Sequence, residues 1–412
     1  MSRLWTIGLT VVLAAGALGA AALVLGDDEQ SRGEDGLPDA SAGQVRFLRS
    51  ATTAFDPQLI AAEGDPRLQR FWDAHYWRMR GYSPFYERHT FRGSPPWTPP
   101  PTHVYRDLYA IYNSPSGRRL IARHPDWVLR NADGNRLFIP FDCSGGSCPQ
   151  FAADVGNPAF RAHWIAAAAR TLSEGYAGIH IDDVNLLMRV SNGTGAFTRP
   201  IDPRTARPMT DSDWRRYVAE FTEQVRSEFP DTEIVHNAIW FADRELQEVA
   251  RAVDAADYVE LERGATDPGL APGGGRYGFD TFLAHIDWLH DRGDGVILEP
   301  YDLTDARREF ELAVYFLIGD GNDAIASRFE ADPDNWWPGW DTDLGPPEGE
   351  RRVWQGLLRR DFAHGIVLVN PPGASIVNAE LGRSYEDLDG KVVDSVSLAP
   401  REGLVLRTGS QP

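Results

Sequence analysis

Two adjacent carboxylates end a short apolar segment near the middle of this 412-residue chain. The segment Gly178–Asn185 reads G-I-H-I-D-D-V-N, so Asp182 and Asp183 follow a short apolar run with Ile179 and Ile181 around His180. A buried parallel strand is typically hydrophobic through its body and polar only where it leaves the sheet. Acids at such a strand end are costly unless they are solvated, hydrogen-bonded or used in chemistry. We therefore interpret this segment as the centre of a catalytic site.

Further acids end two later strand-like segments. Glu260 and Glu262 lie in Y-V-E-L-E-R-G, where alternation places both on one face with Glu262 nearer the end, and Glu299 ends G-V-I-L-E. Hydrolysis of a glycosidic bond needs two carboxyl groups: one protonates the leaving oxygen, and the other attacks the anomeric carbon or activates water. The acids of these segments match that chemistry.

Each acid also has a structural interpretation. The aspartates could cap a turn or pair with an arginine, and Glu260 could be an interior acid paired with Arg80 or Arg263. Glu299 either binds a hydroxyl group or is structural. Strict alternation along the strand places Asp182 and Asp183 on opposite faces, so only one can be the main catalytic group. We expect this group to be Asp182, with Asp183 as a binding or orienting neighbour and Glu262 as its catalytic partner.

Other polar and aromatic residues near predicted strand ends are candidates for binding substrate. The tryptophans among them would form a stacking platform for sugar rings, or would instead seal the barrel against a second domain. Tyr109 and Tyr112 line the predicted third strand. Besides Glu260 and Glu299, the predicted substrate-binding residues are Arg80, Tyr82, Asn237, Tyr301, Trp336 and Trp337.

Short β-rich segments alternate with helical ones between residues 43 and 360, which predicts a (β/α)8 TIM barrel with catalytic residues at the carboxyl ends of its strands. An open doubly wound sheet is the alternative, but no glycine-rich nucleotide loop follows the first strand. The predicted strands are Val45–Arg49, Tyr76–Gly81, Leu108–Tyr112, Gly178–Asp182, Glu233–Ala238, Tyr258–Glu262, Gly295–Glu299 and Asp323–Ser327.

The remaining segments divide the chain further. Residues 361–412 contain short β runs without helices, which predicts a small C-terminal antiparallel β domain resembling a sandwich. Residues 1–26 contain a long apolar run after Arg3, followed by acids, and are predicted to be a signal anchor or a signal peptide. An acidic linker, residues 27–42, follows. The body of the protein is therefore expected outside the cytoplasm, secreted or anchored to the membrane by the uncleaved N-terminal segment.

Charge and cysteine content restrict the functional classes. The net charge of −19 argues against a nucleic-acid partner. The two cysteines, Cys143 and Cys148, are predicted to form a local disulfide, as expected outside the cytoplasm. The histidines are scattered and no motif for a serine hydrolase, a nucleotide or a zinc site occurs, so we expect neither a metal nor a cofactor.

Several of these segments together resemble a known family. The segment G-Y-A-G-I-H-I-D-D-V-N, preceded by D-V-G-N-P-A-F-R-A-H-W, is similar to the hypothetical glycosyl hydrolase group numbered fifteen, as are residues 124–135, the Y-V-E-L-E-R-G segment and G-I-V-L-V-N-P. The resemblance spans about residues 75–407. It implies a TIM-barrel glycosidase, with Asp182 as nucleophile or base and Glu262 as general acid.

We therefore predict an exported glycoside hydrolase that acts on a poly- or oligosaccharide of the cell envelope or the extracellular space. The main alternative is a catalytically inactive barrel that binds envelope glycan, because a fold alone does not guarantee chemistry. A lyase or transglycosylase acting at the same acids is a further alternative.

Overall fold

The structure is a computed structural model that describes residues 42–50, 66–81, 101–301, 304–327, 334 and 336–409. The predicted membrane segment, residues 1–26, lies outside these residues, and so do most of the predicted linker and Tyr82. Within the described part of the chain, no helix is both long enough and apolar enough to cross a membrane.

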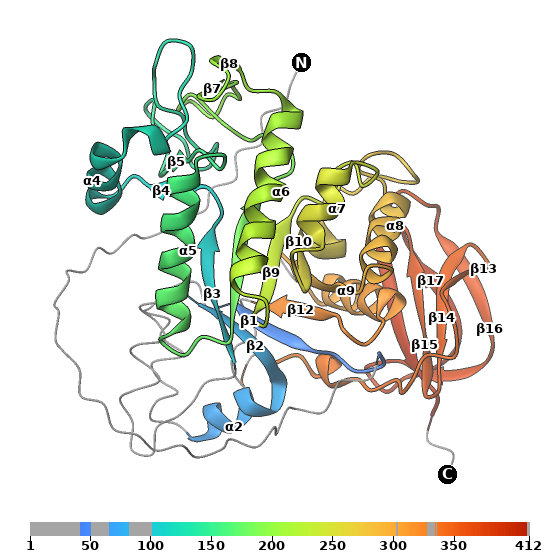
Figure 1. Cartoon of the computed structure of the whole chain (residues 1–412). Helices are drawn as coiled ribbons and strands as arrows, with labels where there is room; N and C mark the ends of the chain where they lie inside the picture. The colour runs from blue at the N-terminus through green and yellow to red at the C-terminus, as the bar shows by residue number, and fades with distance from the viewer. Residues whose placement is uncertain are drawn as a thin grey trace.

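Eight strands close into a barrel, and neighbouring strands run parallel (Figure 1). The predicted TIM barrel is thus confirmed. In their order around the barrel the strands are β1 (Phe47–Ser50), β12 (Ala324–Ser327), β11 (Gly295–Pro300), β10 (Tyr258–Arg263), β9 (Glu233–Ala238), β6 (Gly178–Val184), β3 (Thr102–Asp107) and β2 (Tyr76–Gly81).

Helices between the strands cover the outside of the barrel (Figure 1). The longest, α6, begins with a reciprocal capping box between Thr210 and Asp213, which satisfies two backbone N–H groups at the helix start. Apolar side chains of the helices and strands form the core between the two layers. The helices are α2 (Pro66–His75), α4 (Pro115–Arg123), α5 (Pro158–Leu172), α6 (Asp211–Glu228), α7 (Gln247–Val253), α8 (Phe279–His290) and α9 (Asp305–Ile318).

The prediction for the third barrel strand was wrong. The barrel strand is β3, whereas most of the predicted segment Leu108–Tyr112 forms the short strand β4 (Ala110–Tyr112), which pairs with β5 (Gln150–Ala152) outside the barrel. β3 follows directly on the proline-rich stretch and its sequence T-H-V-Y-R-D carries several polar residues, so it lacks the apolar signature of a buried strand.

The segments between β3 and α5 and between β6 and α6 build an extension at the end of the barrel where the strands terminate (Figure 1). It contains β4, β5 and the small hairpin of β7 (Ile201–Asp202) and β8 (Arg207–Pro208). The predicted disulfide between Cys143 and Cys148 is present and closes a loop in this extension.

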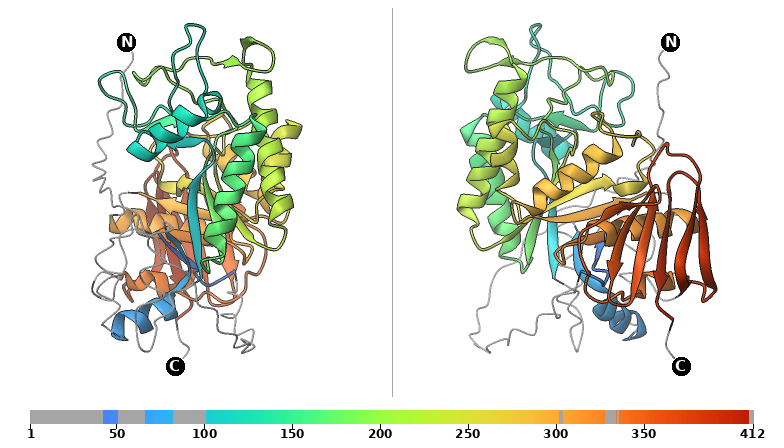
Figure 2. Two further views of the ribbon diagram at one scale, coloured as in Figure 1. Left: turned by 60° about the vertical axis from the view of Figure 1, so that its left-hand side comes forward. Right: turned by 90° about the vertical axis from the view of Figure 1, so that its right-hand side faces the viewer.

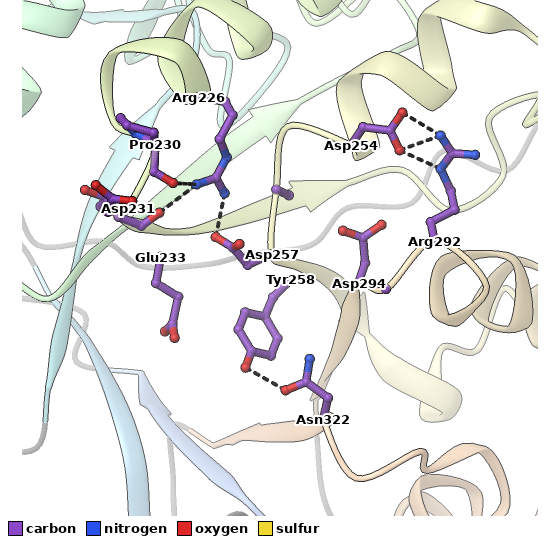
Figure 3. A pocket seen from close by; sticks show the side chains of 13 residues that line it. Arg226, Pro230, Asp231, Glu233, Asp254, Asp257, Tyr258, Arg292, Asp294 and Asn322 are labelled. Atoms are coloured by element: carbon purple, nitrogen blue, oxygen red, sulfur yellow. Dashed lines mark hydrogen bonds and ion pairs between the residues drawn. The ribbon is translucent and has the colours of Figure 1, made fainter. Parts of the chain in front are cut away.

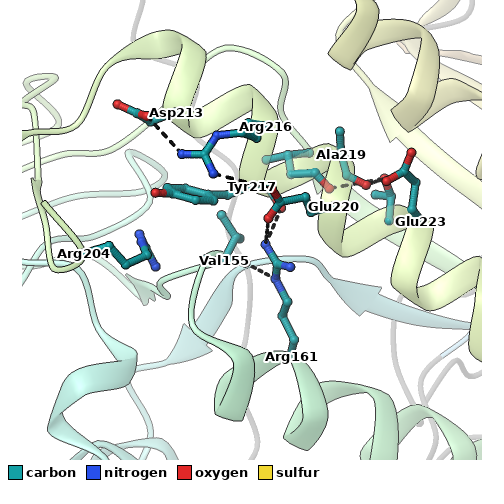
Figure 4. A network of polar contacts seen from close by, with 12 residues as sticks. Val155, Arg161, Arg204, Asp213, Arg216, Tyr217, Ala219, Glu220 and Glu223 are labelled. Atoms are coloured by element: carbon teal, nitrogen blue, oxygen red, sulfur yellow. Dashed lines mark hydrogen bonds and ion pairs between the residues drawn. The ribbon is translucent and has the colours of Figure 1, made fainter.

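Arginine contacts link α5 to α6, as Figure 4 shows for Arg161, and link the loop before α5 to the β7–β8 hairpin. Arg161 of α5 donates to the carbonyl of Tyr217 at 2.9 Å and to the carboxylate of Glu220 at 3.2 Å, both on α6. Arg204, in the β7–β8 turn, donates to both oxygens of the buried Asp154 at 3.0 Å. These contacts fix the loop that leads into α5 against the hairpin.

The C-terminal part of the chain forms an antiparallel β domain, as the sequence predicts, but its described strands form one six-stranded sheet and not the two sheets of a sandwich. Figure 2 shows the sheet as a separate layer beside the barrel. The predicted boundary at residue 361 falls inside the second strand, and the sheet begins at Arg352. Its strands, in spatial order, are β13 (Arg352–Trp354), β14 (Leu357–Phe362), β15 (Gly365–Asn370), β18 (Glu402–Arg407), β16 (Val377–Glu386) and β17 (Val392–Leu398).

The sheet packs closely on α9. A Cβ atom at Gly403 of β18 would lie 2.7 Å from the Cβ atom of Ala313, so only glycine permits this approach. Arg360 of β14 donates to the carbonyl oxygens of Phe316 at 3.0 Å and Gly319 at 2.6 Å, at the C-terminal end of α9. The sheet therefore stabilises a helix of the barrel.

We predict that Gly403→Val lowers the free energy of unfolding by about 1–3 kcal/mol, because the added side chain would overpack the interface with α9. Gly274→Val is the matched control, since a Cβ atom at Gly274 has no neighbour within 4 Å. Chemical denaturation monitored by tryptophan fluorescence measures both variants. Equal stability of the two would contradict the close packing of sheet and helix.

Candidate active site

The predicted acids meet at the carboxyl ends of the barrel strands. In the strand registers, Glu262 of β10 lies beside Glu299 of β11, and Asp182 of β6 lies beside Asp107 of β3. Catalytic side chains of TIM barrels occur at this end, because the strands deliver side chains from several directions to one place. We refer to this region as the acidic rim.

Asp182 is an acid of the rim that three hydrogen bonds orient. Its carboxylate accepts hydrogen bonds from Asn237 Nδ2 at 2.9 Å, from the backbone N–H of Asp183 at 2.7 Å and from the hydroxyl group of Tyr105. The three donors come from three strands or their ends: β9, β6 and β3. The position of this carboxylate is therefore set by the barrel itself.

Asp183 departs from the regular strand. Its φ angle of +57° lies in the left-handed region, and the pairing of β6 with β9 shifts register between Ile181 and Val184. The strict alternation expected from the sequence therefore fails here. Loss of solvation, with the charges of Asp182 and Asp107, raises the pKa of Asp183 well above its ordinary value. Asn185 Nδ2 donates to its Oδ1 at 2.8 Å.

Asp107 is a rim acid that sequence reasoning missed. It is buried, and its carboxylate accepts from the hydroxyl groups of Tyr112 at 2.6 Å and Tyr105 at 3.3 Å. Burial and the nearby charge of Asp182 raise the pKa of Asp107 to about 7. An acid at the end of T-H-V-Y-R-D was the available signal, but the misplaced third strand put Asp107 in a loop.

Glu262 faces the same space from β10. Solvent reaches its side chain, yet surrounding protein atoms restrict solvation, and this effect, together with the charges of Asp182 and Glu299, raises the pKa of Glu262 above its ordinary value. The hydroxyl group of Tyr301 donates to Glu262 Oε1 at 2.8 Å and opposes the shift. Asp182 thus lies near enough to influence whether Glu262 keeps its proton.

The backbone that follows Glu262 is held by a buried glutamate of α9. Glu311 accepts hydrogen bonds from the backbone N–H groups of Ala265 at 3.1 Å and Thr266 at 3.0 Å. A Cβ atom at Gly264 would lie 2.1 Å from Glu311 Oε1, so the glycine allows this contact. Burial raises the pKa of Glu311 to about 8, and the carboxyl group is mainly neutral at pH 7. The helix therefore fixes the exit of β10.

Beneath the rim, a buried arginine connects four strands. Arg80 of β2 donates to both oxygens of Glu260 at 2.7 Å and to Glu299 Oε1 at 2.7 Å, and its Nη1 lies 2.8 Å from His180 Nε2. All four residues are at most 5% exposed. Burial and the adjacent Arg80 lower the pKa of His180 well below its ordinary value, so the imidazole is neutral. We call these four residues the Arg80 cluster.

The Arg80 cluster bears on two predicted substrate-binding acids. Glu260 is fully buried and engaged by Arg80, the interior pairing that was one of its two interpretations. Glu299 is also buried, and its Oε2 lies 3.4 Å from the Tyr301 hydroxyl group, which connects the cluster to Glu262. A substrate-binding role for Glu260, Glu299 or Arg80 stays a prediction.

The tryptophans are not at the acidic rim. Trp336 packs edge-on against Phe47 and Tyr76, the first residues of β1 and β2, and Trp337 packs against Trp340. These contacts lie where strands begin, at the opposite end from the acids. Both side chains are partly buried and pack against the hydrophobic core. Tryptophan rings can build a core as readily as they can form a stacking platform for sugars.

One group of side chains in the described residues has spacing suited to a metal ion. The ligand atoms of His290, Asp320 and Asp323 lie within 4.8 Å of one another, near the start of β12. Protein donors already occupy both oxygens of Asp323: His290 at 2.9 Å and the N–H of Val296 at 2.8 Å on one, and the N–H of Asp320 at 3.1 Å on the other. This group is remote from the acidic rim.

We predict that Arg80→Met destabilises the protein by about 3–5 kcal/mol, because the substitution leaves buried carboxylates without their partner. Arg199→Met is the matched control: Arg199 pairs with Asp211 on the surface, and its loss is expected to change stability by at most about 1 kcal/mol. Denaturant titration compares the two variants. A small effect at Arg80 would show that the cluster does not hold the strands together.

Comparison with known proteins identifies the family. The family model described as hypothetical glycosyl hydrolase family 15 matches residues 105–366. A search of curated proteins gave no match. Similar solved structures include the glycoside hydrolase domain of PelA from Pseudomonas aeruginosa, with 16% identity, coverage of 69% of this chain and 94% of that chain, and a TM-score of 0.39.

The maltogenic α-amylase AmyB from Thermotoga neapolitana is similar at 11% identity, with coverage of 89% of this chain and 99% of that chain and a TM-score of 0.47. The identification depends on the family model, which matches well over half of the chain and includes the end of β3 and all of β6, β10 and β11, with their rim acids. The protein belongs to hypothetical glycosyl hydrolase family 15.

Proposed function

We propose that the protein hydrolyses glycosidic bonds of an extracellular or cell-envelope polysaccharide, with Glu262 as general acid and Asp182 as nucleophile or base. The observation that carries this proposal is the pairing of two carboxyl groups in unlike environments at the acidic rim. Asp182 is held by three hydrogen bonds, whereas Glu262 has a raised pKa, partly through the charge of Asp182. Glycoside hydrolysis requires one carboxyl group that keeps its proton beside a second one that can act as nucleophile or base.

In the proposed reaction, the Glu262 carboxyl group gives its proton to the glycosidic oxygen as the bond to the anomeric carbon breaks. The carboxylate of Asp182 either attacks that carbon to form a glycosyl ester, which water then hydrolyses, or removes a proton from the water molecule that attacks the carbon. Asn237 and Tyr105 keep Asp182 aimed at it. Asp183, through its backbone N–H, orients Asp182, and Asp107 holds Tyr105 from the other side.

The disulfide between Cys143 and Cys148 supports a location outside the cytoplasm, because disulfides persist in oxidising compartments. The apolar N-terminal segment of the sequence supports export as well. A polysaccharide of the cell envelope or its surroundings is accordingly the proposed substrate.

Asp182→Asn and Glu262→Gln are each expected to reduce hydrolysis by at least about a hundredfold, because each removes a proton-transfer or nucleophilic group while keeping its shape. Reducing-sugar release from a panel of envelope glycans measures the effect, with Glu228→Gln, an exposed acid at the end of α6, as the control. Full hydrolysis by both rim variants would disprove the assignment.

The same panel separates the alternatives. Binding of a glycan by the unchanged protein without turnover would favour the inactive, glycan-binding barrel. Product masses distinguish hydrolysis, which adds water, from a lyase reaction, which leaves an unsaturated sugar.

A pH profile tests the role of Glu262 separately. A general acid must hold its proton, so kcat/KM is expected to fall as the pH rises through the raised pKa of Glu262. Tyr301→Phe removes a hydrogen bond that lowers this pKa, and the alkaline limb is therefore expected to move to higher pH. A shift to lower pH, or none, would argue against Glu262 as the acid.

A further inference from the structure

A polar cavity lies at the end of the barrel opposite the acidic rim. Its volume is about 610 Å³, and residues at the starts of β9, β10, β11 and β12 line it (Figure 3). Asp257 directly precedes β10 and Asp294 directly precedes β11, whereas the acidic rim lies where these strands end. The cavity is therefore separate from the proposed active site, and its size is in the range of small-molecule sites.

The lining of this cavity is rich in charge, and acids outnumber bases. Both arginines are already paired within the protein. Arg292 donates to Asp254 at 2.8 Å, and Arg226 donates to Asp257 at 2.5 Å. The acidic residues of the lining are Asp231, Glu233, Asp254, Asp257 and Asp294, and the basic ones are Arg226 and Arg292.

Asp294 is the exception among these acids. It is only 5% exposed, and its Oδ2 atom has no hydrogen-bond partner among the described residues. In Figure 3 its side chain lies among Asp254, Asp257 and Arg292, and no interaction joins it to them. A buried carboxylate oxygen without a donor is rare in native proteins, because its lost hydration is not replaced. The cavity thus offers a strong acceptor to a ligand that brings N–H donors.

We propose that this cavity binds a small organic cation that presents a primary ammonium or guanidinium group to Asp294. The excess of acids gives the cavity a negative potential, and an N–H donor would complete the hydrogen bonding of Oδ2. Calcium fits less well, because it needs six to eight oxygen ligands and the neighbouring carboxylates are engaged by arginines.

The protonation of Asp294 makes cation binding depend on pH. Burial, with the charges of Asp254 and Asp257, raises the pKa of Asp294 to about 7, although Arg292 and Arg226 oppose the shift. Only the ionised carboxylate attracts a cation. Affinity for the cation is therefore expected to increase as the pH rises through about 7.

The test is calorimetric titration of the full chain with n-butylammonium, methylguanidinium and calcium chloride in separate runs. The first two runs show whether the cavity binds an ammonium or a guanidinium group. One-site binding of at least one organic cation is expected, and Asp294→Asn should weaken it about tenfold or more through the loss of a charge-assisted hydrogen bond. The variant is expected to fold, since it removes an unpartnered buried charge; thermal unfolding checks this.

Asp231→Asn is the matched control, because it removes the same charge from an exposed residue of the same lining. Its effect on affinity should be much smaller than that of Asp294→Asn. Equal weakening by the two variants, no binding of either organic cation, or binding of calcium alone would overturn the proposal. None of these results depends on glycan hydrolysis, so they leave the proposed function untouched.

Discussion

The buried charge of Arg80 is the constraint on which the upper half of the barrel depends. A guanidinium group with almost no exposure is tolerated only if acceptors surround it, and here Glu260 and Glu299 supply them from two neighbouring strands. Arg80 reaches them from β2, across the interior. A buried network of ion pairs thus joins these strands directly beneath the acidic rim.

The two carboxyl groups proposed for catalysis, above the Arg80 cluster, differ in their hydrogen-bond donors and in their surroundings. Asp182 receives hydrogen bonds from strands on either side, whereas Glu262 receives one from the described residues, donated by Tyr301, and lies near other acids. The difference follows from position in the barrel and not from residue type. The hydroxyl group of Tyr301 also approaches Glu299, so the Arg80 cluster and the proposed general acid share a neighbour.

The sequence predicted the parts of this architecture that depend on local patterns. Apolar runs that end in acids located β6, β10 and β11, and the disulfide followed from two close cysteines. Asp107 was missed because β3 is a polar strand after prolines, and the left-handed turn at Asp183 has no signature in residue type. The Trp336 contacts and the pairing of Asp182 with Asn237 join distant segments, which only folding brings together.

The helix α9 has two partners that are far apart in the chain. The C-terminal sheet packs against α9 at Gly403. Glu311, on the same helix, accepts hydrogen bonds from the backbone just beyond Glu262. The C-terminal sheet, α9 and the loop that follows β10 are therefore connected by direct contacts. A chain shortened after the barrel would expose an apolar face of α9 and loosen the anchor of the Glu262 loop, so the sheet is part of the scaffold of the acidic rim and not a detachable module.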